Sequence, residues 1–145
     1  MKGVIHLGKA KEFLRDVRRM ELTVQSKLEQ LDKIRRDMTT IKAVDYSKQK
    51  LDGGDPAGAH YESLAAKLID EEARVNEVID SLSDLREQAT RIIDRMEDRT
   101  EAAVLTYYYI GGCTWEETAE KAYVALRSVY YIHGRALYHF EELMD

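Results

Sequence analysis

The chain has 145 residues with a single proline, and 34% of the residues are charged and 44% hydrophobic. This composition is typical of long helices and coiled coils rather than of sheet proteins, and the length suits one compact domain, or one extended element with a very small domain. The net charge of −5 argues against general affinity for nucleic acid. We therefore expect an all-α protein that is helical almost throughout.

The cysteine content and the ends of the chain bear on its compartment. Cys113 is the only cysteine, so an internal disulfide is excluded, and the N-terminus lacks the apolar run and small-residue cleavage site of a signal peptide. No apolar stretch approaches the ~18 residues that span a bilayer. These features predict a cytoplasmic protein that is not inserted in a membrane.

An apolar seam with alternating spacings of three and four predicts a helix over about 7–43. The alternation is the heptad pattern of a coiled coil with one irregularity, because two successive spacings of three lead to Ile34. The seam consists of Leu7, Ala10, Leu14, Val17, Glu21, Val24, Leu28, Leu31, Ile34, Met38 and Ile41. Three glycines and the proline lie between positions 53 and 58, and they predict a loop over 44–58 because they disfavour helix.

A second seam predicts a helix over about 59–97, and its three-four alternation has no break. Its members are Tyr61, Leu64, Leu68, Glu71, Val75, Val78, Leu82, Leu85, Ala89, Ile92 and Met96. The intervening loop is short enough to return the chain antiparallel, so residues 1–97 are predicted to form a coiled-coil hairpin. Two helices make only a thin core, and we therefore expect a homodimer in which each seam buries its outer edge against a second copy.

Charge supports this pairing of the two predicted helices. Residues 1–43 carry eleven Lys/Arg and six Asp/Glu, whereas residues 59–97 carry five and ten. A basic first helix would face an acidic second helix along its flanks. Glu21 and Glu71 interrupt the seams; they either set the register or the oligomeric state, or lie at a solvated edge.

The heptads stop after Met96, and residues 98–145 predict a small second domain. We expect a helix over about 100–110, two glycines, and a short helix that ends near Ala122. Thr114 suits the N-cap of that helix, with Glu117 completing a capping box. After a turn at 123–125, a last helix over 126–143 would bury Val129, Ile132, Ala136, Leu137 and Phe140. This order of elements is that of a helix-turn-helix.

The stretch from Glu116 to Phe140 resembles the helix-turn-helix of region 4 of sigma-70-type factors without a gap. The matching positions are Glu116, Glu117, Ala119, Val124, Val129, Ile132, Ala136 and Leu137. Together with the predicted hairpin, two further runs resemble small phage and prophage proteins of Firmicutes: Tyr109, Gly112 and Thr114 to Glu117, and Tyr130 with Ile132 to Leu137. The resemblance implies transcriptional regulation.

Several positions depart from the family pattern. Ala125 replaces the Ser or Thr that caps the recognition helix, so the first backbone N–H groups lose an acceptor. Leu126 replaces a polar or basic residue, and Thr118 a buried aliphatic one. The turn, in which the family often has glycine, has Ala122 and Tyr123.

Residues 125–140 contain two arginines and no acid, and this defines the candidate DNA-binding residues. Their positions in the motif predict that Arg127, Ser128 and Tyr131 face the major groove, while Tyr130 and Arg135 hold phosphate oxygens. An alternative interpretation is that the seven tyrosines of this third serve core and inter-domain packing. No Cys or carboxylate lies at metal-ligand spacing from His133 and His139, so we do not expect these histidines to bind a metal.

The sequence therefore predicts a phage-type DNA-binding transcriptional regulator, with the hairpin for dimerisation and duplex DNA as its partner. The alternative is an interaction module or scaffold that docks on RNA polymerase or a phage protein without contacting DNA, which the acidity of residues 98–145 favours. No phosphate-binding loop, metal motif or nucleophile with a base at a recognisable spacing is present. We expect no enzymatic activity, no cofactor and no metal.

Overall fold

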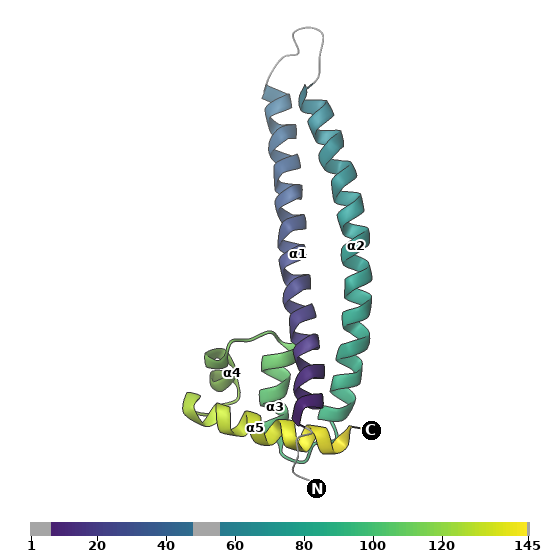
Figure 1. Ribbon diagram of the computed structural model, residues 1–145. Coiled ribbons are helices and arrows are strands. Elements are labelled where there is room, and N and C mark those ends of the chain that lie inside the picture. Colours follow the sequence, from purple (N-terminus) through teal and green to yellow (C-terminus); the bar gives the residue numbers. More distant parts are fainter. Residues whose placement is uncertain (1–6, 48–55, 145) are drawn as a thin grey trace. The chain divides into compact units, whose positions relative to one another are not determined.

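The computed structural model describes residues 7–47 and 56–144, and within these ranges it is all-helical, without a strand (Figure 1). The elements are α1 (Leu7–Ser47), α2 (Pro56–Ile93), α3 (Arg99–Leu105), the π-helical turn η1 (Thr106–Ile110), α4 (Trp115–Lys121) and α5 (Leu126–Leu143). The prediction of an all-α protein is confirmed. None of the helices in the described ranges has the length and apolarity that a membrane span requires.

The predicted loop over 44–58 is wrong at both ends. Helix α1 continues to Ser47 and α2 begins at Pro56, while 48–55, with Gly53 and Gly54, lie outside the described residues. Proline is tolerated at the first position of a helix because its fixed φ is helical and its missing N–H would have no helical partner there. Pro56 therefore begins a helix instead of preventing one.

Helix α2 also ends earlier than the predicted residue 97. It stops at Ile93, and a turn leads to Asp98, whose side chain accepts hydrogen bonds from the backbone N–H groups of Thr100 and Glu101 at 2.9 and 3.1 Å. An aspartate that satisfies two free N–H groups is a strong N-cap. Asp98 is therefore the N-cap of α3, and the chain changes direction in the turn that precedes Asp98.

The described residues form two compact units, which consist of 7–22 with 80–144 and of 23–47 with 56–79. In the first unit the α1 seam is buried, with Ala10, Leu14 and Val17 inaccessible to solvent. Glu21 is buried as well and pairs with Arg86 of α2. Glu21 therefore does not lie at a solvated edge.

In the second unit, Val24, Leu31 and Ile34 of α1 and Val75 of α2 are buried. Leu28 is 44% exposed, contrary to the seam prediction. The two successive steps of three that precede Ile34 place Leu28 about 120° around the helix from it. The early step in the heptad pattern therefore turns Leu28 away from the buried side.

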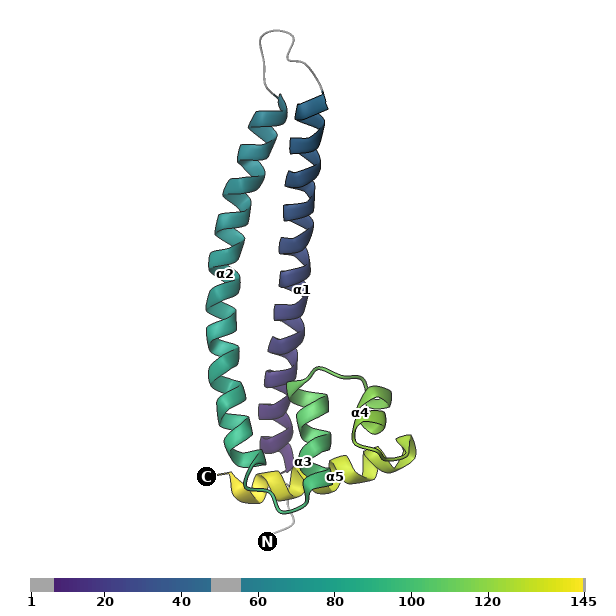
Figure 2. The ribbon, with the colours of Figure 1, turned by 180° about the vertical axis from the view of Figure 1, so that it is seen from behind.

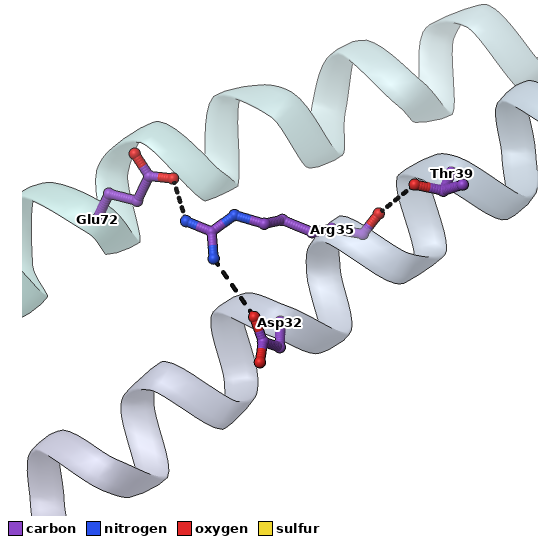
Figure 3. A network of polar contacts seen from close by, with 4 residues as sticks. All are labelled: Asp32, Arg35, Thr39 and Glu72. Atoms are coloured by element: carbon purple, nitrogen blue, oxygen red, sulfur yellow. Dashed lines mark hydrogen bonds and ion pairs between the residues drawn. The ribbon is translucent and has the colours of Figure 1, made fainter.

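One ion-pair network joins α1 and α2 within this second unit (Figure 3). The guanidinium of Arg35 lies 2.8 Å from Glu72 of α2 and 3.5 Å from Asp32 of its own helix, and the Thr39 hydroxyl donates to the Arg35 carbonyl at 3.0 Å. This pair matches the expected attraction between a basic α1 and an acidic α2. Its members are largely exposed, so its contribution to stability is below about 1 kcal/mol.

Candidate nucleic-acid interface

Helix α4 begins with the capping box that the sequence predicts. The Thr114 hydroxyl accepts from the Glu117 N–H at 3.1 Å, and the Glu117 carboxylate accepts from the Thr114 N–H at 2.9 Å. These bonds with Thr114 hold the pKa of Glu117 below its usual value. Thr118 is fully buried, and its hydroxyl donates to the Thr114 carbonyl at 2.8 Å, so this buried polar group is satisfied.

The turn between α4 and α5 closes through two backbone hydrogen bonds. The Tyr123 N–H donates to the Glu120 carbonyl at 3.2 Å, and the Val124 N–H donates to the Ala119 carbonyl at 2.9 Å. Tyr123 has a φ of 59°, so the pattern is a Schellman motif with a tyrosine at the left-handed position where glycine is preferred. The predicted turn at 123–125 is confirmed, and α5 begins at Leu126 as expected.

A small apolar cluster fixes α5 against α3 and α4. Val104 of α3, Ala119 of α4 and Val129 of α5 are buried together. Trp115, Ala122, Val124 and Ile132 pack around them. Ala119 is a small residue, and it lies where α4 packs against Val129 of α5. Figure 2 shows α3, α4 and α5 from behind, with the tight connection between α4 and α5.

The opposite face of α5 is open to solvent and carries most of the predicted DNA-binding residues. Arg127, Tyr130 and Tyr131 are exposed, the last to 69%, and Ser128 is half-buried. Ala125 occupies the N-cap position without a side-chain hydrogen bond, as predicted. Arg127, Tyr131 and Tyr138 recur at spacings of four and seven, so they form one exposed stripe along the helix.

Arg135 has a different environment from Arg127. Its guanidinium lies 3.6 Å from the buried carboxylate of Glu101 and 5.7 Å from the centre of the Tyr131 ring. Glu101 also contacts Nδ1 of His139 at 2.5 Å. Arg135 therefore stabilises a buried acid of α3, whereas Arg127 stands in the first turn of α5. DNA contact by the five candidate residues stays a prediction.

The sequence allows two interpretations of the seven tyrosines of the C-terminal third, either core packing or, for Tyr130 and Tyr131, DNA contact, and the structure separates them by burial. Tyr107 and Tyr108 are half-buried and Tyr109 is buried, as core packing requires. Four others are exposed: Tyr123, Tyr130, Tyr131 and Tyr138. The core interpretation therefore holds for η1 and does not account for α5.

A cationic and aromatic group that the sequence did not predict adjoins α4 and α5. Arg18 of α1 lies over the Tyr108 ring, which stacks on Trp115 with ring centres 3.6 Å apart. Trp115 in turn has Tyr130 and His133 of α5 at 5.5 and 4.7 Å. The basic residues near the start of α1 were the sequence feature that could have indicated this group. The heptad pattern placed them instead on the flank of a hairpin.

No family model matches the chain, and no curated protein or solved structure shows significant similarity to it. The class that its own structure defines is an all-helical protein with an exposed polar and aromatic face on α5. Among the residues described, no cluster of three or more His, Cys, Asp or Glu side chains is arranged to hold a metal ion.

Proposed function

We propose that the chain is a phage-type DNA-binding transcriptional regulator. Residues 98–145 act as a sigma region-4-like helix-turn-helix, and α1 with α2 act as a coiled-coil hairpin that dimerises. The observation that carries the proposal is the solvent-exposed first turn of α5. There Arg127 lies on the side of the helix opposite the buried Val129, and residues near the N-terminus of a recognition helix are those that reach base edges.

The charge around α5 supports this function. Residues 126–140 contain no acid, and the uncapped N-terminus of an 18-residue helix carries partial positive charge. An arginine there is suited to bidentate bonding with guanine. We therefore expect Arg127 to supply base recognition, with Ser128 and Tyr131 beside it, and Tyr130 to supply backbone contact. Arg135 would have to leave Glu101 to reach a phosphate.

Apolar side chains on the long helices support dimerisation. Leu22, in the first unit, is 41% exposed, and Ile69, in the second, is 67% exposed. Large apolar side chains at such exposure on long helices favour burial against a second copy. A dimer would present two α5 helices to a site with two-fold symmetry.

Selection from a pool of random duplex DNA tests the proposal. The wild-type protein should enrich a roughly two-fold-symmetric site and bind it less tightly as salt rises, because phosphate contacts release counterions. Arg127→Ala should weaken binding to the enriched site about tenfold, since one bidentate contact contributes roughly 1–3 kcal/mol.

The matched control is Arg91→Ala. Arg91 is an exposed arginine of α2 in the same unit, 2.6 Å from Glu87, and its removal should leave affinity unchanged. If Arg127→Ala binds as tightly as the wild type, α5 has no recognition role. No enrichment at either salt concentration would remove the DNA-binding function.

A second candidate function is a protein-interaction module that docks on RNA polymerase or a phage protein without DNA. The exposed tyrosines favour it, because aromatic residues are enriched at protein interfaces, and Tyr123 is 95% exposed. The exposed acids Glu116, Glu117 and Glu120 also disfavour an approach of α4 to phosphate. A saturable complex with polymerase that survives nuclease treatment, and that Tyr131→Ala weakens, would support this function over DNA binding.

A further inference from the structure

A groove of about 670 Å³ lies within the first unit, beside the aromatic group of Tyr108 and Trp115. We call it the α1 groove. Four cations and no carboxylate line it. The cations are Lys11, Arg15, Arg18 and Arg19 of α1, and residues of η1, α4 and α5 complete the lining.

One wall of the α1 groove is held in place by Arg18. Its guanidinium donates to the main-chain carbonyls of Tyr108 and Cys113 at 2.5 and 2.8 Å and lies 3.9 Å from the centre of the Tyr108 ring. The other face of Tyr108 stacks on Trp115. Because the faces of Tyr108 are occupied on both sides, this wall offers charge and ring edges to a ligand rather than a free stacking platform.

The same stripe of α1 carries two further cations, because Lys11, Arg15 and Arg18 follow one another at spacings of four and three. Lys11 and Arg15 are exposed and lie one helical turn apart, so they are neighbours on the same face of α1. Within the part of the chain that the structure describes, neither pairs with a carboxylate. Arg19 differs, since it lies 3.6 Å from Asp16. Two adjacent like charges without a counter-charge are mutually destabilising, and an anion between them would relieve this.

The floor contains a neutral hydrogen-bonded pair. The Tyr109 hydroxyl lies 2.6 Å from Nε2 of His133; Tyr109 is buried and His133 is half-buried. The floor therefore supplies polar atoms without negative charge. An anion in the α1 groove would meet the cations of α1 and no lining carboxylate.

We propose that the α1 groove binds phosphate, with Lys11 and Arg15 as the principal contacts and Arg18 as a fixed positive charge. The phosphate belongs either to a free polyphosphate ligand or to a nucleic-acid backbone beside α5; both present the same oxyanion. The site stands apart from base reading by α5, because none of its lining residues belongs to the first turn of that helix.

Trp115 provides the probe, because it is the only tryptophan of the chain and lines the groove. Inorganic pyrophosphate, and separately a short duplex of arbitrary sequence, are titrated into the full chain at constant ionic strength. Tryptophan emission reports the site and calorimetry reports affinity. We expect saturable binding that Lys11→Gln with Arg15→Gln weakens about tenfold, since two surface charge contacts contribute up to ~1 kcal/mol each.

The matched control replaces Lys33 and Arg36 by Gln, an exposed Lys/Arg pair of the same helix in the second unit; it should bind like the wild type. The exchange Lys11→Arg with Arg15→Lys preserves both charges. It should bind like the wild type, which would show that the double Gln variant binds weakly because it lacks charge and not because it is misfolded. A response to pyrophosphate supports a free ligand, and a response to the duplex alone supports backbone phosphate. No response to either, or equal affinity in the double Gln variant, overturns the proposal.

Discussion

The guanidinium of Arg18 lies 3.9 Å from the centre of the Tyr108 ring and donates a hydrogen bond to the carbonyl of the same tyrosine. A second bond reaches the carbonyl of Cys113. These contacts join α1 to η1 and to the segment between η1 and α4, 90 and 95 residues along the chain. One side chain thus satisfies two carbonyls that precede the capping box of α4.

Arg18→Ala should destabilise the first unit by about 2–4 kcal/mol, because two bonds from a charged donor and a cation–π contact are lost. Chemical denaturation followed by Trp115 fluorescence measures the change. Arg18→Lys should recover only part of the loss, since an ammonium lacks the planar fork that serves two carbonyls. A loss no greater than that of the surface variant Arg91→Ala would contradict the anchoring role.

Tyr123→Gly should stabilise the protein by about 1 kcal/mol. The residue holds a φ of 59°, which costs non-glycine residues roughly 1–2 kcal/mol, and its side chain is 95% exposed, so little packing is lost. The control Tyr123→Ala removes the same ring but keeps Cβ, and should leave stability nearly unchanged. Thermal unfolding distinguishes the variants; equal melting temperatures for Gly and Ala would show that the turn is not strained.

His133 should make stability depend on pH. Burial, assisted by the charge of Lys11, lowers its pKa to about 4, while an unfolded histidine titrates near 6.5. Its contribution is therefore fully present above pH 6.5 and is lost as the pH falls toward 4, because only the unfolded chain takes up the proton in that window. The groups that face it are Lys11 of α1, Tyr108 and Tyr109 of η1 and Trp115 of α4.

The control variant is His133→Gln, whose side chain keeps polar atoms near Tyr109 but does not titrate. Between pH 7 and 4 the wild type should lose on the order of 1–2 kcal/mol more than this variant, a range that allows for solvent screening at a partly exposed ring. Parallel curves of unfolding free energy against pH would mean that His133 is not held neutral.

Glu21 and Glu71 occupy equivalent seam positions but should respond differently to replacement by alanine. Glu21 is buried and pairs with Arg86 across to α2, so Glu21→Ala should cost about 1–3 kcal/mol. Glu71 is half-buried and pairs with Arg74 of its own helix at 2.7 Å; Glu71→Ala should cost less than about 0.5 kcal/mol. Equal losses in denaturant unfolding would contradict a special role for the Glu21 pair.

The features that the sequence predicted correctly are those that depend on neighbouring residues. The capping box of Thr114 and Glu117, the turn at Tyr123 and the helix from Leu126 all arise from contacts within about four residues. Side-chain periodicity likewise indicated many of the buried positions of α1 and α2, with Leu28 as an exception. Pro56 shows the limit even of local reasoning, since one residue type both ends and begins helices.

The contacts that define the α1 groove depend instead on residues distant in the sequence. Arg18 meets Tyr108 and Cys113, and His133 meets Tyr109, across separations of 24 to 95 residues. Periodicity identifies which side of a helix is polar but not which other segment that side will meet. Only the tertiary structure decides this, because it depends on how all the helices of the unit share one core, and that packing places the cations of α1 beside the aromatic rings of η1 and α4.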